Sequence, residues 1–285
     1  MTPPHLAIPK TYKLYIGGKF PRSESGRTYE ILSGNGSFLA NAAKASRKDA
    51  RDAVVAARAA VGGWSGATAY NRGQVLYRIA ELLEGRRTQF VDEIVSVEGV
   101  SAAVAGKQVD AAIDTWVWYA GWADKFAQVA GNANPVAGPY FNLSVPEPTG
   151  VVAIVAPDDS LLGFASVVAP ALVPGNTVVV IASERAPLSA ISLAEVLATS
   201  DVPGGVVNIL TGAPAEIAPW LASHADVNGL DLAGAESLDW VDLQISAADT
   251  LKRVLPPEPG VPELSLDRIV AFTETKTVWH TKSLI

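Results

Sequence analysis

Cysteine is absent from the 285 residues of the chain. The chain can therefore form no disulfide, hold no metal through a thiolate and use no cysteine nucleophile. Histidine is also scarce, and His5, His224 and His280 lie too far apart in sequence for a metal-binding motif. We therefore expect no metal site.

Positive charge is in deficit as well. Lys and Arg together number 22 against 29 Asp and Glu, which gives a formal net charge of −7. Proteins that bind nucleic acid or dock on anionic lipid have the opposite balance. We therefore expect neither nucleic acid nor a membrane surface as a partner.

One uncharged stretch, residues 160–183, is long enough to span a bilayer. Pro170 and the Pro-Gly-Asn turn at 174–176 interrupt it, which favours a buried helix followed by a buried strand. Residues 1–10 carry prolines and no long apolar core, unlike a secretory signal peptide. A cytoplasmic location is the resulting expectation.

Apolar residues make up 49% of the sequence, which is typical of a globular protein with a substantial core. In the first half they recur every three or four positions, the period of a helix. Ser46 has the chemistry of an N-cap for the first helix, and Gly62-Gly63 that of its end. The pattern predicts a hairpin over 12–22, a strand over 28–32 and helices over 47–61, 69–84 and 88–97. A longer helical pattern over 101–130 is expected to break or bend near its glycines.

The pattern changes after Gly150, where short apolar runs alternate with helical periods. The expected strands are 151–156, 177–182, 206–210 and 227–232, and the expected helices are 162–172, 189–199 and 216–224. This alternation predicts βαβ crossovers and a sheet covered on both faces. The predicted fold class is α/β, a Rossmann-like doubly wound parallel sheet with N-terminal helices. Residues 140–145 and 269–280 are β-prone and predict a small antiparallel ribbon beside it.

Several motifs then match one family in its own order. They are WYAGWADK at 118–125, EPTGVV at 147–152, APAL at 169–172, GNTVV at 175–179, PGGVVN at 203–208 and FTETKTVW at 272–279. On these residues the chain resembles the NAD(P)-dependent aldehyde dehydrogenases, continuously over about 12–234 and again from about 269. A single motif would be weak evidence, but the ordered set is specific.

The resemblance implies a domain organisation. Residues 1–137 correspond to the N-terminal hairpin and helices of the cofactor-type domain, and residues 150–267 to its Rossmann-like portion. Residues 138–149 and 268–285 correspond to the oligomerisation ribbon of the family. The family's catalytic domain belongs between Gly234 and Arg268, where this chain has only a short segment, so a catalytic domain is not expected.

The resemblance also locates the family's chemical groups. Its reaction needs a thiolate nucleophile, an oxyanion hole and a general base. The chain has no thiol, and Asp159 stands where the family has an oxyanion-stabilising Asn. Glu258 lies near the general-base position but is offset by one residue and flanked by prolines, so it is a displaced relic or a solvated loop acid. No catalytic residue is expected.

Cofactor binding is expected to be weak at best. Glu184 and Gly234 match cofactor-contacting residues of the family and are the expected vestigial NAD or NADP site. A pyrophosphate needs free backbone N–H groups and a positive field. Four positions depart from the family pattern and remove favourable contacts or add negative charge: Ile181, Ala235, Glu236 and Asp239.

Three functions remain open from the sequence. The first is a non-catalytic structural or regulatory partner of a full-length aldehyde dehydrogenase, or a protein that associates with itself. The second is a dinucleotide-binding module, and the third an NAD(P)-dependent oxidoreductase with residual activity. An aromatic cluster could stack a ligand, but core or interface packing is the favoured interpretation: Trp116, Trp118, Tyr119 and Trp122.

Overall fold

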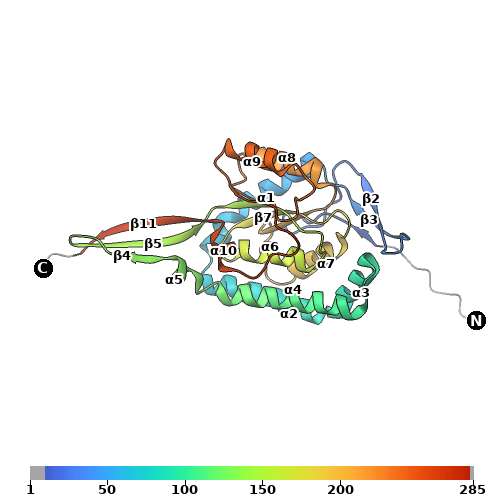
Figure 1. Ribbon diagram of the computed structural model, residues 1–285, viewed down its shortest axis with the longest axis horizontal. Coiled ribbons are helices and arrows are strands. Elements are labelled where there is room, and N and C mark those ends of the chain that lie inside the picture. Colours follow the sequence, from blue (N-terminus) through green and yellow to red (C-terminus); the bar gives the residue numbers. More distant parts are fainter. Residues whose placement is uncertain (1–9, 283–285) are drawn as a thin grey trace, which may run out of the picture.

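The computed structural model describes residues 10–282, which form three sheets, of which the central one is covered by helices (Figure 1). The central sheet has the order β10-β9-β6-β7-β8, and every neighbouring pair in it is parallel. Its strands are β6 (Val151–Val155), β7 (Thr177–Ile181), β8 (Val207–Leu210), β9 (Gly229–Asp231) and β10 (Arg253–Leu255). The predicted parallel α/β fold is confirmed, and the short edge strand β10 is an addition that the sequence pattern missed.

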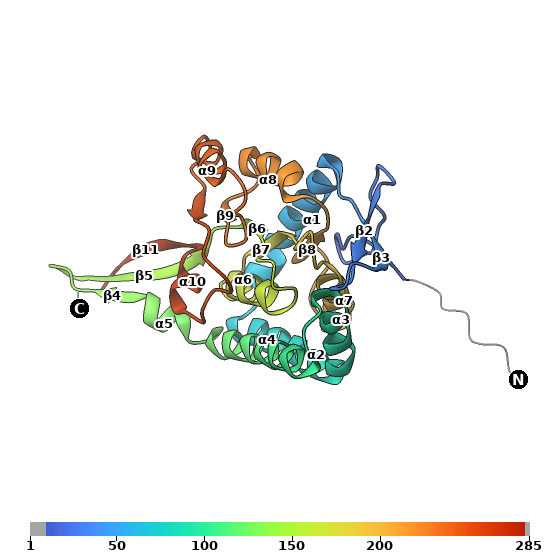
Figure 2. The same cartoon turned by 45° about the vertical axis from the view of Figure 1, so that its right-hand side comes forward.

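The central strands are apolar because both faces of the sheet are covered. Along β6, Val152 and Ile154 belong to one buried core, whereas Val151, Ala153 and Val155 belong to the other. The first core packs against α2, α4, α6 and α7, and the second against α1 and α8 (Figure 2). The crossover helices are α6 (Leu162–Leu172), α7 (Leu188–Leu197) and α8 (Pro214–Ser223).

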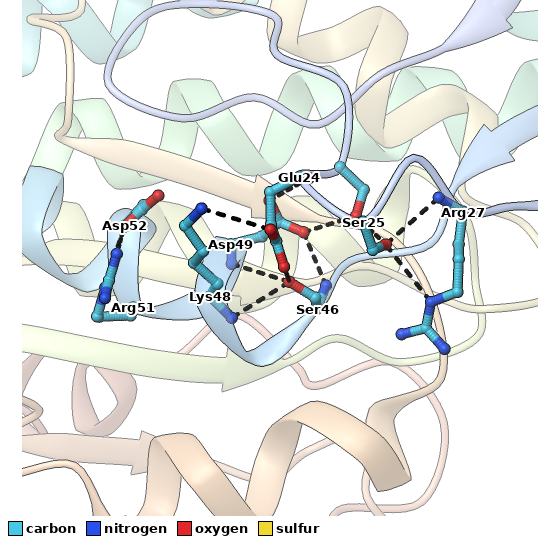
Figure 3. Close-up of polar contacts among 9 residues, drawn as sticks. Glu24, Ser25, Arg27, Ser46, Lys48, Asp49, Arg51 and Asp52 are labelled. Carbon is cyan, nitrogen blue, oxygen red and sulfur yellow. Dashed lines mark hydrogen bonds and ion pairs between the residues drawn. The ribbon is translucent and has the colours of Figure 1, made fainter.

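The first long helix, α1 (Arg47–Gly66), begins at Ser46 as predicted. Ser46 Oγ accepts from the Asp49 backbone N–H, and an Asp49 carboxylate oxygen accepts in return from the Ser46 N–H at 2.8 Å (Figure 3). This reciprocal pair is a capping box. The predicted end at Gly62-Gly63 is wrong, because Trp64 is 2% exposed and its Nε1 donates to the Leu172 carbonyl at 3.1 Å. Packing of Trp64 extends the helix past the two glycines.

The remaining N-terminal helices follow the predictions closely. They are α2 (Ala69–Gly85), α3 (Arg87–Glu98), α4 (Ala102–Trp122) and α5 (Phe126–Ala130). The helical pattern over 101–130 was expected to break or bend near its glycines, and it does so at residues 123–125, just after Gly121. Trp116 and Tyr119 on α4 are fully buried, and Trp118 packs on Trp122 with ring centroids 5.8 Å apart. The packing interpretation of the aromatic cluster is confirmed.

A small sheet of order β1-β3-β2 lies at the N-terminal side. It consists of β1 (Thr11–Tyr12), β2 (Thr28–Leu32) and β3 (Phe38–Ala43). The turn at Gly17-Gly18 is confirmed, with φ of 61° and 77° and a bridge between Ile16 and Lys19. β2 has its predicted bounds, whereas β3 was not anticipated. Tyr15 bridges to Ile209 and so covers the outer edge of β8.

The third sheet is a ribbon that projects from the body of the molecule (Figures 1 and 2). Its order is β11-β5-β4, with β4 (Asn132–Asn134), β5 (Tyr140–Pro148) and β11 (Thr273–Thr281) all antiparallel. The predicted ribbon is confirmed, but its C-terminal strand begins later than residue 269. Ser265 caps a short helix, α10 (Leu266–Val270), which buries Ile269 and leads into the buried Phe272. No helix among residues 10–282 is long and apolar enough to cross a membrane.

Candidate functional site

A pocket of about 270 Å³ opens at the carboxyl edge of the central sheet. It is lined by the loop after β6, the loop after β9 and the segment that follows β10. From β6 the chain crosses to β7 on one side and later returns to β9 on the other, so the pocket lies at the switch point of the sheet. Ligands of doubly wound α/β proteins bind at this position.

Carboxylates dominate the lining of the pocket. Asp158, Asp159, Glu236 and Glu258 all contribute to it, and no Lys or Arg is among the lining residues. Within the part of the chain that the structure describes, no group of His, Cys, Asp and Glu has the arrangement of a metal site. The lining residues therefore place negative charge in the pocket and supply no positive charge of their own.

Asp159 lies deepest among these acids. Burial and the nearby Glu98 raise the pKa of its carboxyl, although the backbone N–H groups of Gly163 and Leu162 oppose the shift. Its Oδ1 is buried and has no hydrogen-bond partner among the described residues. Glu98 is held close by, where its Oε1 accepts from Ser160 Oγ at 2.6 Å. A carboxylate in this place repels a developing oxyanion instead of stabilising it.

Gly234 lines the pocket, and its lack of a side chain has a packing reason. A Cβ at this position would overlap the carbonyl of Ala156 at the end of β6. The Gly234 N–H also donates to the Val155 carbonyl at 2.9 Å. Close approach of two backbones therefore requires glycine here with or without a dinucleotide.

Glu184 follows β7 in a bend and is exposed, but it does not line the pocket. The structure thus does not bring the two expected cofactor residues together in one cavity. Ile181, at the end of β7, is 1% exposed and belongs to the core under α8. The cavity enclosed there has a volume of about 10 Å³ and only apolar lining residues. It is far too small for a nucleoside.

The remaining residues of the turn after β9 have structural roles. Ala235 is fully buried in the core. Asp239 is the N-cap of α9 (Trp240–Ala248), a helix that the sequence pattern missed, and its Oδ1 accepts from the Asp242 N–H at 3.3 Å. Glu236 is exposed at the mouth of the pocket. The residues present do not fit a pyrophosphate, because the turn offers two carboxylates and no positive side chain.

Sequence reasoning missed a buried ion-pair cluster next to the pocket. Asp231, at the end of β9, is 1% exposed, and its Oδ2 accepts from Arg268 Nη2 at 2.5 Å. Arg268 Nη1 donates to Glu258 Oε2 at 2.9 Å, so Glu258 is an ion-pair partner and not a free loop acid. Burial raises the pKa of Asp231, and Arg268 opposes the shift. The only sequence signal was one acid inside the apolar run 227–232.

This cluster anchors the short segment that stands where the resemblance places the family's catalytic domain. Residues 256–265 lead directly from β10 to α10, and they carry Glu258 on their course. At their far end the Ser265 N–H lies 3.4 Å from the Tyr119 hydroxyl of α4. The segment is thereby fixed at the pocket and at the core, and the described residues contain no second parallel sheet.

The two described histidines lie on different elements, His224 at the end of α8 and His280 on β11. The ring of His224 stacks edge-on against Trp220, and its Nδ1 accepts from the Asp226 N–H at 3.1 Å. Burial lowers the pKa of His224. His280 lies on β11 in the ribbon, and His5 lies outside the described residues.

A parallel sheet with β6 at a switch point, covered by helices on both faces, defines the class of the NAD-binding Rossmann-like proteins. The sequence pattern of the aldehyde dehydrogenase family matches residues 21–255. The chain belongs to the aldehyde dehydrogenase family.

Individual relatives agree with this assignment. The chain is 34% identical over 258 residues to retinal dehydrogenase 2 of Homo sapiens, covering 88% of this chain and 49% of that protein. It is 32% identical over 262 residues to the cytosolic 10-formyltetrahydrofolate dehydrogenase of Mus musculus, covering 87% of this chain and 28% of that protein. The chain thus spans half the length of these relatives or less.

Solved structures show the same partial coverage. HpcC from Thermus thermophilus superposes with a TM-score of 0.82 and 32% identity, over 87% of this chain and 48% of that one. A point mutant of betaine aldehyde dehydrogenase from Staphylococcus aureus, in complex with NAD+, superposes with a TM-score of 0.80 and 26% identity. That superposition covers 85% of this chain and 49% of the other.

Proposed function

We propose that this chain is a non-catalytic member of the aldehyde dehydrogenase family and acts as a structural or regulatory partner of a full-length aldehyde dehydrogenase. The observation that carries the proposal is the combination of a cysteine-free sequence with a ten-residue path, 256–265, that joins β10 directly to α10. Family chemistry requires a thiolate, and this chain has none to supply.

The electrostatics of the pocket support the same proposal. A carboxylate about 6 Å from a phosphate, at an effective dielectric near 20, costs about 3 kcal/mol before salt screening. That cost corresponds to roughly a hundredfold loss of affinity. With Glu236 at the pocket, Asp239 at the start of α9 and Ile181 buried at the end of β7, we expect NAD and NADP to bind weakly or not at all.

A dinucleotide-binding module is the second candidate. Gly234 at a switch-point pocket favours it, and the betaine aldehyde dehydrogenase that superposes on this chain holds NAD+. Isothermal titration calorimetry with NAD+, NADH and NADP+ separates the candidates. The partner proposal expects no saturable heat at micromolar ligand, whereas a dissociation constant in the low micromolar range would favour the binding module.

The proposed partner follows from the ribbon. In the family, as the resemblance implies, the ribbon of one subunit pairs with the catalytic-domain sheet of its neighbour. This chain has the ribbon β11-β5-β4 but no such sheet among its described residues. It could therefore dock on an intact dehydrogenase but could not receive a neighbour's ribbon. Co-purification from the native source, with identification of any full-length aldehyde dehydrogenase that accompanies the chain, tests this partner.

A further inference from the structure

The two edges of the ribbon are protected unequally. On the β4 side, β4 covers only residues 142–144 of β5, and Pro146 and Pro148 occupy the uncovered part of that strand. Proline has no N–H to offer, which is a common means of blocking an edge. β11 has nine residues without proline or a register shift, and its outer side has no partner strand among residues 10–282.

Two hydrogen bonds establish which backbone groups point outward from β11. The Lys282 N–H donates to the Pro139 carbonyl at 2.7 Å, and the Thr149 N–H donates to the Phe272 carbonyl at 3.2 Å. Both bonds join an even-numbered residue of the β11 side to an odd-numbered residue of the β5 side. Because backbone groups alternate along a strand, the odd-numbered residues of β11 direct theirs away from β5. Those residues are Thr273, Thr275, Thr277, Trp279 and Thr281.

Charged side chains on an edge strand discourage pairing with another strand, but Glu274 and Lys276 of β11 already form ion pairs within the chain. Lys276 Nζ donates to Glu147 of β5 at 2.9 Å, and the two carboxylate oxygens of Glu274 accept from Nε and Nη2 of Arg253, each at 2.8 Å. Trp279 nevertheless stays 58% exposed beside Tyr140. A long, regular edge with an exposed Trp, whose charged side chains are paired within the chain, is suited to pair with another strand.

We propose that two copies of this chain pair through β11, antiparallel about a two-fold axis at Thr277, to form a six-stranded ribbon. Thr277 is the midpoint of β11, so this register aligns residues 274–280, the accessible part of the strand, with the same residues of the second copy, whereas Thr273 is buried. It places Glu274 of one copy opposite His280 of the other, and Thr275 opposite Trp279. An axis at Lys276 would instead set two lysines side by side.

This pairing goes beyond the proposed partner role, since it needs only this chain and does not depend on whether the chain binds aldehyde or NAD. The ribbon projects from the body of the molecule (Figure 1). With antiparallel ribbons side by side, the two bodies lie at opposite ends of the assembly.

Sedimentation of two matched variants tests the edge. Thr277→Pro removes an outward N–H at the axis in each copy, whereas Thr277→Ala keeps it. Both lose the hydroxyl that lies 2.9 Å from Ser144 Oγ. We expect wild type and Thr277→Ala to be dimers, and Thr277→Pro to dissociate at least about a hundredfold more readily with an unchanged circular dichroism spectrum. A dimer that survives Thr277→Pro would overturn the proposal, as would a wild type that stays monomeric alone and assembles only with an intact dehydrogenase.

Single cysteines test the register, because the chain has none of its own. With the axis at Thr277, the two copies of Thr277→Cys face each other across a hydrogen-bonded pair, about 5.5 Å apart at Cα. The two copies of Thr275→Cys lie about 14 Å apart, four residues along the strand. A short bis-maleimide is expected to link Thr277→Cys efficiently and Thr275→Cys at least about tenfold less. Equal linking of the two, or preferential linking of Thr275→Cys, would contradict the register.

Discussion

Asp159 combines a half-buried carboxylate with an unpartnered oxygen, Oδ1, at the position where the family has an amide. Glu98 adds a second negative charge nearby, and no described Lys or Arg lines the pocket to offset the two. The ionised side chain of Asp159 therefore lowers the stability of the folded state, and a carboxylate cannot donate a hydrogen bond to an oxyanion.

Asp159→Asn is expected to stabilise the chain at neutral pH. The folded-state pKa of Asp159 is raised above the unfolded value near 3.8. The free energy of unfolding of wild type therefore falls as pH rises from 3.8 to the raised pKa, and it stays at the lower value above that pKa. The amide avoids this loss and retains an acceptor for the Leu162 and Gly163 N–H groups. Because the side chain is partly solvated, we expect a gain below about 1 kcal/mol.

Urea unfolding at two pH values measures this effect. At pH 7 the variant should have the higher free energy of unfolding, and at pH 3 the two proteins should agree. A variant less stable than wild type at pH 7, or a gain that persists unchanged at pH 3, would show that burial and repulsion by Glu98 do not destabilise the Asp159 carboxylate.

The start of α1 ties that helix to the N-terminal sheet. Asp49 is 4% exposed, and its carboxylate accepts from the Ser46 N–H, from Ser23 Oγ at 2.7 Å and from the Glu24 N–H at 3.0 Å. Asp52, one turn further on, is exposed and bonds only its neighbour Arg51 among the described residues (Figure 3). Asp49 and Asp52 lie on the same helix, but only Asp49 accepts hydrogen bonds from residues that precede the helix.

Asp49→Ala should therefore destabilise the chain by about 2–3 kcal/mol, because three buried or half-buried donors lose their charged acceptor. The matched variant Asp52→Ala should change stability by less than about 0.5 kcal/mol, as expected of an exposed ion pair. Thermal unfolding followed by circular dichroism compares them. Equal effects of the two substitutions would show that the capping box does not anchor α1.

Local patterns predicted β6 to β9 of the central sheet and the Ser46 cap, because an apolar run and a capping residue can each be recognised from a few neighbouring residues. The end of α1 was not predictable in this way, since it depends on Trp64 reaching the carbonyl of Leu172 far along the chain. The same holds for the site: Gly234 was found from its motif, whereas the bond between Arg268 and Asp231 joins residues 37 positions apart. Such contacts arise only when the sheet is assembled.

The ribbon and the body of the molecule meet at residues 268–272. Ile269 and Phe272 belong to the main core, and Arg268 holds the buried Asp231. The resemblance assigned these residues to the ribbon, but in the structure they lie in and after α10 and support the central sheet. A deletion that tests the ribbon must therefore begin after them.

Removal of residues 276–285 is expected to abolish assembly with an intact aldehyde dehydrogenase while leaving the body folded. It takes away most of β11 and spares Ile269 and Phe272. Size-exclusion chromatography of the mixture, with tryptophan fluorescence as the control for folding, measures the effect. If a folded deletion variant still co-elutes with the dehydrogenase, the ribbon is not the docking element.

Aldehyde oxidation is the most direct test of the account, which holds that a family fold persists here without family catalysis. Purified chain is incubated with NAD+ or NADP+ and a panel of short and aromatic aldehydes, and reduced cofactor is followed by absorbance against a heat-treated sample. The account predicts no difference between the two samples, since no thiol is present and Asp159 stands in the oxyanion position. Saturable formation of NADH or NADPH that requires the folded chain would contradict it.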